Sequence, residues 1–438
     1  MIVQKFGGTS VGSVKRIKDV ASLVTRGDYK GNLVVLSAMS GTTNTLVEIC
    51  NYIKGGNAEG AGDIINQLQD KYITHVSELY SSEEMKKKTH NFVVAVFDYL
   101  RSFTKDIFTE REEKKILSQG EILSTNMMTN YLLEQGVSVR LLDALSFMRV
   151  DMNGEPDSWY IKQRLSEVME AGETADLYIT QGFVCRDATG NVDNLQRGGS
   201  DYTASLLGAA MGAEEIQIWT DIDGMHNNDP RFVENTTCVP HLYFEEASEL
   251  AYFGAKILHP TCIQPAKFNN IPVRLLNTMD PDAPGTVINN VKDKGTIKAV
   301  AAKDNITAIK IKSGRMLLAY GFLRKVFEIF ESYQTAIDMI CTSEVGVSMS
   351  IDNPTYLPQI ETQLRKLGTV TIDRDMCIIC VVGDMEWENK GFEAHVLGAL
   401  KDIPVRMVCY GGSNYNISFL IRQEDKQKAL NALSATLF

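Results

Sequence analysis

The sequence predicts an α/β protein with a mostly parallel central sheet covered by helices, followed by two small α+β units. Short apolar segments alternate with helical patterns from residue 1 to about residue 290, which is typical of a parallel sheet buried on both faces. From about residue 305 onward, one order of strands and helices occurs twice, which indicates a tandem pair of βαββαβ units.

The first part of the chain supplies the central sheet. Strands are expected at Ile2–Phe6, Leu33–Ser37, Val139–Leu142, Leu177–Gly182 and Glu215–Thr220, and helices at Val14–Thr25, Thr45–Tyr52, Glu121–Glu134 and Ser200–Met211. Residues 54–115 are mostly polar with helical patterning, which predicts an inserted helical lobe. Parallel sheets of this kind bind ligands at the carboxyl ends of their strands, so we expect the functional residues there.

The second part repeats its apolar pattern at a fixed offset. Ile309 and Phe322 recur as Ile379 and Phe392, each 70 residues later. Strands are expected at Ile306–Lys312, Ile337–Thr342, Gly346–Ile351, Thr369–Asp373, Cys377–Val382, Val405–Tyr410 and Asn416–Ile421, and helices at Phe322–Tyr333, Leu357–Leu367, Phe392–Leu400 and Asp425–Leu437.

The domain boundary is expected near the Pro-rich and polar residues that follow position 280. We therefore predict a first domain at 1–290, a linker at 291–304, and two small units at 305–375 and 376–438.

Composition excludes several classes of protein. The 438 residues contain 44 basic and 55 acidic side chains, so a uniformly basic nucleic-acid binder and a polybasic membrane anchor are both disfavoured. The longest apolar runs are strand-sized, and glycines occupy the place of a signal-peptide apolar core, so a cytoplasmic protein is expected. The eight scattered cysteines are interpreted as free thiols, and Cys377 and Cys380 as core residues of a strand.

Two glycine-rich turns are candidate anion sites. The first, Lys5–Gly12, follows a predicted strand and opens a helix, so its backbone N–H groups and the Lys5 ammonium could face an anion. It fits neither the P-loop nor the dinucleotide-binding pattern, and taken alone it could be a purely structural turn. The second, Arg197–Asp201, places two glycines and a serine before a helix, behind an arginine that can grip a carboxylate.

Other chemical signals are weaker when taken alone. Asp221 and Asp223 end a predicted strand, and Lys256 follows a glycine in Phe253–Lys256. The six histidines show no metal-ligand spacing, so no protein metal site is expected. A nucleophile elbow of the Gly-x-Ser-x-Gly type is missing from the sequence, so hydrolase chemistry finds no support.

Together these motifs resemble those of the aspartate kinases, in the family's order and over essentially the whole chain. The matching segments are Lys5–Gly12, Ser37–Asn44, Gly120–Glu121, Gln181–Phe183, Arg197–Asp201, Trp219–Asp221, Asp229–Arg231, Phe253–Lys256 and Thr342–Val345. The resemblance implies an amino-acid-kinase fold followed by two ACT domains. It also implies that the chain's last element completes the first ACT unit.

The resemblance implies transfer of the ATP γ-phosphoryl group to the β-carboxylate of L-aspartate, with Mg²⁺, in the synthesis of lysine, threonine and methionine. The implied catalytic residues are Lys5, Asp201 and Lys256, and the implied aspartate-binding residues are Ser37, Thr43, Glu121, Arg197 and Ser200. The implied ATP-binding residues are Lys5, Phe6, Gly7, Gly8, Thr220, Asp221, His226, Arg231, Lys256 and Ile257. The family often has Tyr at position 226, so the histidine is a departure that bears on nucleotide affinity.

The ACT pair implies feedback inhibition by lysine or threonine and assembly into a homodimer or larger homo-oligomer. The implied effector positions are Met316, Phe322, Leu323, Asp338, Ser343 and Glu344. A lysine effector would need a carboxylate for its side-chain ammonium, which Asp338 or Glu344 could supply.

Two alternatives stay open from the sequence. One is a related kinase that forms an acyl phosphate on glutamate or an acetylated amino acid, and the other is an amino-acid sensor with an inactive kinase part. The tandem ACT tail argues against the first, and the intact Lys5, Glu121, Arg197 and Lys256 argue against the second.

Overall fold

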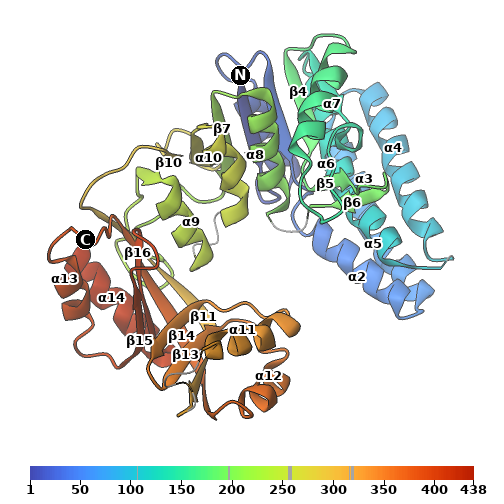
Figure 1. The fold of residues 1–438 in the computed structure, drawn as a ribbon. Coiled ribbons are helices and arrows are strands. Elements are labelled where there is room, and N and C mark those ends of the chain that lie inside the picture. The colour runs from blue at the N-terminus through green and yellow to red at the C-terminus, as the bar shows by residue number, and fades with distance from the viewer. Residues whose placement is uncertain (106, 196–197, 255–258, 315, 317–319) are drawn as a thin grey trace. The chain divides into compact units, whose positions relative to one another are not determined.

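The computed structural model describes residues 1–105, 107–195, 198–254, 259–314, 316 and 320–438 (Figure 1). The chain forms two compact units, Met1–Gly224 with Leu258–Asn290, and Met225–Ile257 with Val291–Phe438. Residues 225–257 therefore group with the second unit, although the sequence placed them in the first domain. The reason is that helix α9 (Phe244–Tyr252) packs against two long strands of the second unit, β11 (Ile297–Lys312) and β14 (Thr369–Gly383).

The first unit is built on the predicted, mostly parallel sheet. Its strands follow the order β3-β4-β2-β1-β7-β9-β10, and every neighbouring pair is parallel except β9 and β10. The strands span Ile2–Phe6 (β1), Asn32–Leu36 (β2), Val139–Leu142 (β3), Leu177–Gln181 (β4), Glu215–Thr220 (β7), Val273–Asn277 (β9) and Thr286–Asn289 (β10). Val34 and Leu36 of β2 are fully buried, as expected for a strand covered on both faces.

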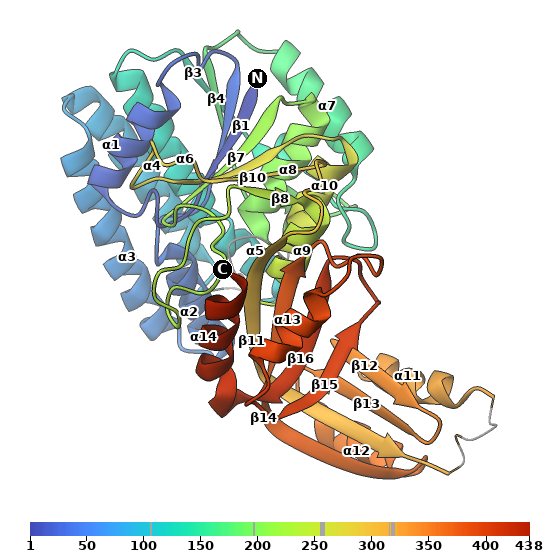
Figure 2. The same ribbon diagram turned by 90° about the vertical axis from the view of Figure 1, so that its left-hand side faces the viewer.

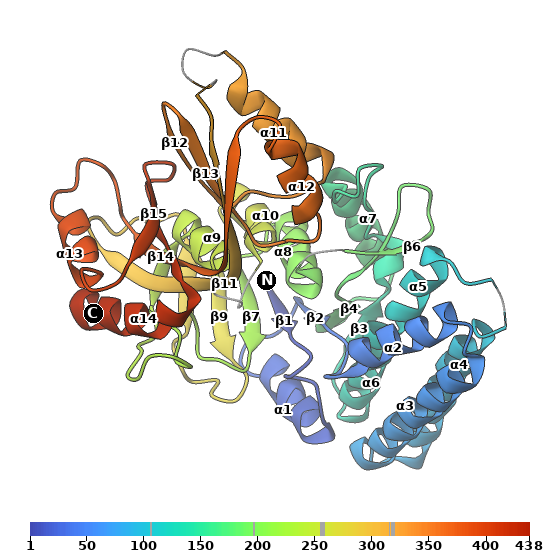
Figure 3. The same ribbon diagram turned by 90° about the horizontal axis from the view of Figure 1, so that it is seen from below.

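Helices cover this sheet, and the predicted helical lobe is present. Helices α3 and α4 of the lobe pack against each other as a long pair (Figure 3). The helices of this unit span Val14–Val24 (α1), Thr42–Lys54 (α2), Ala58–Leu79 (α3), Glu83–Ser102 (α4), Glu110–Leu117 (α5), Gln119–Glu134 (α6), Ser158–Glu170 (α7), Gly199–Met211 (α8) and Gln264–Phe268 (α10). A small hairpin joins β5 (Val184–Arg186) to β6 (Val192–Asn194), and none of the helices in the described ranges has the length and apolarity needed to cross a bilayer.

The second unit contains one antiparallel sheet of six strands in the order β12-β13-β11-β14-β16-β15 (Figure 2). The long strands β11 and β14 run through both halves of this sheet and pair with each other. The first half closes as a complete βαββαβ unit between the second part of β11 and the first part of β14. Its other elements span Phe322–Ser332 (α11), Met339–Ser343 (β12), Gly346–Ile351 (β13) and Leu357–Leu364 (α12).

The second half takes its remaining strand from the start of β11. Ala301 pairs with Cys380 and Ala302 with Ile379, so residues predicted as a linker (291–304) include a core strand. The other elements of this half are α13 (Phe392–Ala399), β15 (Val405–Tyr410), β16 (Asn416–Arg422) and α14 (Lys426–Leu437). A short strand, β8 (His241–Tyr243), precedes α9 and is not part of the six-stranded sheet.

The expectation that the chain's last element completes the first ACT unit is therefore wrong for this structure. Leu430 and Leu433 of α14 pack in the core of the second half, with Val396 and Phe419. Within the six-stranded sheet, the first half is thus inserted into the second half. The two halves meet at a register shift between Lys303 and Ile306. Cys377 and Cys380 are fully buried, in agreement with their interpretation as core residues.

Helix α9 is fastened to the sheet by a buried charged cluster. The Asp338 side chain is 1% exposed and lies 2.7 Å from the Lys303 ammonium, which also lies 2.9 Å from Asp352. Tyr252, at the end of α9, donates its hydroxyl to Asp338 at 2.9 Å. Next to it, a side chain on Gly254 (φ +124°) would meet the Ala302 carbonyl oxygen at 2.1 Å. The end of α9 therefore contacts β11 through a hydrogen-bonded ion pair and through a close backbone approach.

Replacing Lys303 with Met should lower the free energy of unfolding of the second unit by about 3 kcal/mol, because the buried Asp338 carboxylate loses its counter-ion. Urea unfolding would measure the change. Lys366→Met removes an equally long but exposed side chain, and it should shift the transition by less than about 0.5 kcal/mol. Adding Asp338→Asn to Lys303→Met should recover part of the loss, and a double variant less stable than Lys303→Met would contradict this explanation.

Candidate active site

A cavity of about 440 Å³ opens in the first unit at the carboxyl ends of strands β1, β2 and β4. This is the edge of the sheet where the sequence predicted the functional residues. The cavity is lined by Gly8, Thr9, Ser37, Ala38, Met39, Ser40, Gly41, Thr43, Asn44, Glu121, Phe183, Gly199 and Ser200.

The glycine turn after β1 forms one wall of the cavity. The Gly7 N–H donates to the Trp219 carbonyl at 3.3 Å, and the Ser40 N–H donates to the Gly8 carbonyl at 3.1 Å. A side chain on Gly8 would place its Cβ 2.8 Å from the Ala38 carbonyl oxygen, so the turn can approach the loop after β2 only because residue 8 is glycine.

Replacing Gly8 with Ala should lower kcat/KM by about 10- to 100-fold, because the clash with the Ala38 backbone displaces the turn by a fraction of an ångström or more. Gly62→Ala is the matched control, since a Cβ there meets nothing within 4 Å. Steady-state kinetics of both variants would test the expectation. Gly62→Ala should retain full activity and gain slightly in helix stability, and equal activities in the two variants would contradict the role of the Gly8 contact.

An ion pair joins the start of the sheet to helix α8. The Lys5 ammonium, at the end of β1, lies 2.7 Å from Oδ1 of Asp201 in the first turn of α8. The two side chains are 10% and 17% exposed, so the charges are partly shielded from water. A Cβ placed on Gly7 would lie 3.4 Å from the same ammonium, which shows how close Lys5 comes to the glycine turn.

Helix α8 begins at the cavity with its backbone donors uncapped by any side chain. Gly198 is the N-cap residue, with φ 71° and no side-chain cap. Ser200 accepts a hydrogen bond from the Ser37 hydroxyl at 2.9 Å, which links the ends of α8 and β2. A Cβ on Gly182 would lie 2.3 Å from the Ser200 hydroxyl oxygen, so the contact requires glycine there. An uncapped helix N-terminus of this kind favours an anionic ligand.

Glu121 is the buried charge of the site. It lies on α6, is 4% exposed and accepts the Ala38 N–H at 3.2 Å through Oε1. Its Oε2 makes no hydrogen bond to any residue in the described ranges. Burial raises the pKa of Glu121 from the usual 4.5 to about 7, against the opposing effect of the Ala38 N–H. A buried carboxylate with one free oxygen in a cavity wall is suited to receive a cationic group.

Phe183 was given no role by the sequence reasoning, yet it also lines the cavity. It has a positive φ of 67°, which is strained for an aromatic residue, and its N–H donates to Thr203 at 3.0 Å. The available signal was its place in Gln181–Phe183, directly after a predicted strand. Ala38, Met39, Ser40 and Asn44 were likewise missed as individual residues, although Ser37–Asn44 was identified as a motif.

The structure brings many of the predicted site residues together and leaves others apart. Lys5, Gly7, Gly8, Ser37, Thr43, Glu121, Ser200 and Asp201 lie at or beside the cavity. The side chain of Phe6 is buried and stacks on Trp219 at 5.6 Å, so only its backbone is available to a ligand. Arg197, Lys256 and Ile257 lie outside the described residues.

The expected nucleotide residues fall in both units. Thr220 ends β7 and donates to the Ile222 carbonyl at 3.2 Å, and Asp221 is exposed directly after it. His226 and Arg231 belong to the second unit. His226 lies 2.8 Å from the Thr236 hydroxyl, and Arg231 donates to both carboxylate oxygens of Asp229, at 2.9 and 2.6 Å.

Comparison with known proteins identifies the family. The model of the amino acid kinase family matches residues 1–277, and an ACT domain model matches residues 379–437. Aspartokinase 1 (chloroplastic) of Arabidopsis thaliana is 34% identical over an alignment that covers all of this chain and 80% of the relative. The chain belongs to the aspartokinase family. Lysine-sensitive aspartokinase 3 of Escherichia coli is 32% identical and is covered over 99% of its length.

Solved aspartokinase structures also share the fold of the enzyme. Aspartokinase III of E. coli, in complex with aspartate and ADP, aligns over the whole of both chains with a TM-score of 0.84 and 30% identity. Aspartate kinase of Clostridium acetobutylicum aligns over the whole of both chains with a TM-score of 0.85 and 25% identity. These matches confirm the predicted family, the kinase fold and the ACT regulatory domain.

The predicted effector residues lie in the first ACT unit of the enzyme. Phe322 and Leu323 begin α11 behind Gly321, which has φ 79° and no side-chain cap, and Met316 precedes them. Ser343 ends β12, and Glu344 is exposed just beyond it. Asp338 is buried against Lys303 and Tyr252, so its charge is already matched within the protein.

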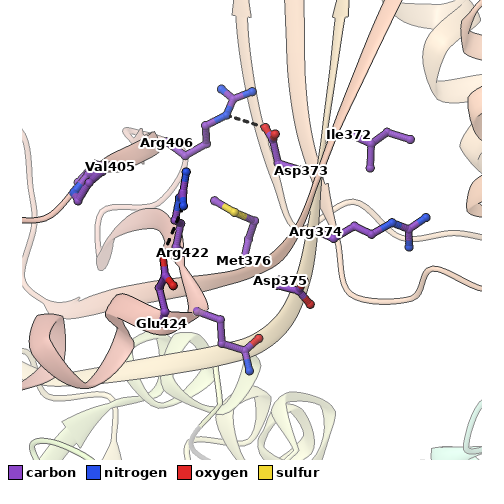
Figure 4. Close-up of a pocket in the computed structure, with 11 residues that line it drawn as sticks. Ile372, Asp373, Arg374, Asp375, Met376, Val405, Arg406, Arg422 and Glu424 are labelled. Carbon is purple, nitrogen blue, oxygen red and sulfur yellow. Dashed lines mark hydrogen bonds and ion pairs between the residues drawn. The ribbon is translucent and has the colours of Figure 1, made fainter.

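A second cavity, of about 640 Å³, lies in the second unit beside the bend of β14 (Figure 4). Arg406 pairs with Asp373 at 3.0 Å and Arg422 with Glu424 at 3.4 Å, and the Arg374 side chain points away from both (Figure 4). Since the arginines do not converge and acidic residues offset them, this cavity lacks the concentrated positive charge that a phosphorylated ligand requires.

Proposed function

We propose that the enzyme transfers the γ-phosphoryl group of ATP to the β-carboxylate of L-aspartate, giving 4-phospho-L-aspartate for lysine, threonine and methionine synthesis. The observation that carries this proposal is one cavity lined by the glycine turn and by the buried Glu121, with the Lys5–Asp201 ion pair beside it. The complex of E. coli aspartokinase III with aspartate and ADP supports aspartate and an adenine nucleotide as the ligands.

The reaction needs charge compensation more than a base. A carboxylate with a pKa near 4 is ionised at neutral pH, so the acceptor is already a nucleophile. The difficulty is to bring it close to the anionic γ-phosphate, and positioned cations and backbone N–H groups lower that barrier.

Each substrate has its own set of residues in this proposal. Glu121 receives the α-ammonium of aspartate, because this residue lines the cavity and its buried Oε2 has no hydrogen-bond partner among the described residues. Lys5, with the backbone of the glycine turn and the start of α8, stabilises the transferring phosphoryl group, and Asp201 orients Lys5. Aspartate is also bound by Ser37, Thr43, Ser200 and Arg197 in this proposal, and Lys256 neutralises phosphate charge. The nucleotide is held by Phe6, Gly7, Gly8, Thr220, Asp221, His226, Arg231 and Ile257.

Mg²⁺ fits this arrangement as an ion carried by the nucleotide. In the part of the chain that the structure describes, no three His, Cys, Asp or Glu side chains form a metal cluster. Kinase Mg²⁺ is held mainly by phosphate oxygens and water with one or two carboxylates, and Asp201 is the carboxylate beside the glycine turn. The ion would neutralise phosphate charge.

We also propose lysine as the feedback effector and a homodimer or larger homo-oligomer as the assembly. E. coli aspartokinase III has been solved with lysine and aspartate, and it matches this chain over its whole length with 31% identity and a TM-score of 0.80. Glu344 is the exposed carboxylate among the predicted effector residues and can pair with the lysine side chain. Leu323 and Phe327 on α11 are part-exposed and apolar, as in a surface that pairs with a second copy. A cytoplasmic location stays a prediction.

The test of the function is ADP release from ATP–Mg²⁺ with L-aspartate, L-glutamate or no acceptor, with hydroxylamine present to trap an acyl phosphate. Aspartate-dependent turnover with hydroxamate formation is expected. Turnover with glutamate alone would overturn the proposal in favour of a related acyl-phosphate kinase, and binding of an amino acid without turnover would favour a sensor.

Glu344→Gln should weaken lysine inhibition by about 10-fold or more, since a charge-assisted contact to the effector ammonium is lost. Activity without lysine should not change. Isothermal titration with lysine and threonine would measure binding directly. No heat from lysine, or lysine binding that is equally tight in the variant, would contradict the proposed effector or the proposed role of Glu344, respectively.

A further inference from the structure

Two cysteines, one from each ACT domain, lie next to each other in the second compact unit of the chain. Cys341 lies on β12 and Cys409 on β15, and these two strands lie against each other (Figure 2). Their Sγ atoms are 3.4 Å apart. The Cys341 thiol donates to the Val408 carbonyl at 3.1 Å, and the Cys409 thiol donates to the Ile340 carbonyl at 3.4 Å. Each thiol is thus held against the backbone of the opposite strand.

Small molecules can reach this pair. Both cysteines line a cavity of about 460 Å³ and are partly exposed. Five of the other cysteines, Cys50, Cys185, Cys262, Cys377 and Cys380, are buried, and Cys238 is the remaining partly exposed one. The pair is therefore set apart from the other thiols both by access and by the closeness of its sulfur atoms.

We propose that Cys341 and Cys409 form a reversible intrachain disulfide, made by exchange with a low-molecular-weight disulfide, that fastens the two ACT units together. The sulfur atoms need to approach by about 1.4 Å to reach bonding distance, which side-chain rotation and a small strand shift can supply. The bond would link elements 68 residues apart in the sequence, from Cys341 to Cys409.

The chemistry balances without any further reactant. The Cys341 thiolate attacks one sulfur of the external disulfide and expels one thiolate, which takes up the proton released by Cys341. Cys409 then loses its proton and attacks the Cys341 sulfur, which expels the second thiolate. The two protein thiols lose two electrons and two protons in total, and the external disulfide becomes two thiols.

One member of the pair, Cys341, lies on β12, the strand next to which or on which several proposed effector residues lie. Asp338 directly precedes β12, Cys341 lies within it and Ser343 ends it. A bond to β15 would fix the position of β12, so the oxidised enzyme should respond to lysine differently from the reduced enzyme. This consequence rests on the proposed effector site, whereas formation of the disulfide does not.

The experiment treats the full-length enzyme with oxidised glutathione and measures intact mass, followed by non-reducing peptide mapping. The expected result is a loss of about 2 Da and a peptide that links Cys341 to Cys409, reversed by dithiothreitol. Burial, followed by the neighbouring Cys341 thiol, raises the pKa of the Cys409 thiol to about 12. Because only the thiolate attacks, the disulfide should form faster as the pH rises from 7 to 9. Cys409→Ser should instead accumulate a glutathione adduct on Cys341, and Cys341→Ser should form no intrachain disulfide.

Cys238→Ser is the control and should oxidise as the unaltered enzyme does. The proposal would be overturned if Cys341 and Cys409 could still be alkylated after treatment with oxidised glutathione, or if the disulfide joined two separate chains. Lysine inhibition of the oxidised and reduced enzyme gives a separate readout, with a shift of at least about threefold expected. An unchanged response would overturn the coupling to β12, and no inhibition in either form would count against lysine as effector without touching the disulfide.

Discussion

Replacing Lys5 with Met should lower kcat/KM by about 10³- to 10⁵-fold, with the larger share of the loss in kcat. A cation that neutralises a transferring phosphoryl group contributes on that scale. The Lys5 side chain is 10% exposed, lies one residue before the end of β1, and has its ammonium 2.7 Å from Asp201. Methionine keeps the apolar stem of the side chain, so the sheet should fold around it while the positive charge is lost.

Kinetics of ATP and aspartate turnover, with thermal unfolding alongside, would measure this effect. Lys30→Met, at an exposed position, is the control and should change neither property. Asp201→Asn should cost less than Lys5→Met, and a double variant no slower than Lys5→Met would show that Asp201 acts only by orienting Lys5. A double variant whose losses multiply would show that Asp201 has a separate role at the substrate or the metal ion.

Much of the fold could be predicted because local patterns determine it. Continuous apolar strands between helices specify a buried parallel sheet, and the 70-residue repeat specifies two similar units. The pairing of β11 could not be predicted. Lys298, Lys303 and Asp304 make its first half resemble a polar linker, yet their charges are matched by Asp293, Asp338 and Lys426, the last two of which are distant in sequence.

The candidate site shows the same limit. The glycine turns and Ser37 could be identified from motifs beside the ends of strands, because topology brings such ends together, and Glu121 from a motif at the start of a helix. The raised pKa of Glu121, the strained backbone of Phe183 and the burial of Asp338 arise from tertiary packing, which single segments do not encode. The meeting of Cys341 and Cys409 likewise depends on how two distant strands pack.

Glu121→Gln should raise the KM for aspartate by about 100-fold, because the charge-assisted contact that we propose between Glu121 and the α-ammonium becomes a neutral one. The KM for ATP should change little. Glu59→Gln is a matched control, since Glu59 also lies in the first turn of a helix but is exposed. Initial rates at varied aspartate would test this, and an unchanged KM would remove Glu121 from the aspartate site.

The pH dependence separates binding from stability. In the proposed site, only ionised Glu121 can pair with the ammonium, and its pKa is about 7. At pH 6, kcat/KM for aspartate should therefore be about 10-fold below the plateau that it reaches at high pH. The pKa of Glu121 is about 7 in the folded enzyme and 4.5 in the unfolded chain, so between these pH values the folded enzyme binds a proton that the unfolded chain has lost. The free energy of unfolding therefore falls as the pH rises from 4.5 to 7, by about 3 kcal/mol in total. Glutamine has no such proton to lose. Glu121→Gln should therefore be more stable than the unaltered enzyme at pH 8 while binding aspartate more weakly, and a variant that is both weaker in binding and less stable at pH 8 would indicate a structural role for Glu121 instead.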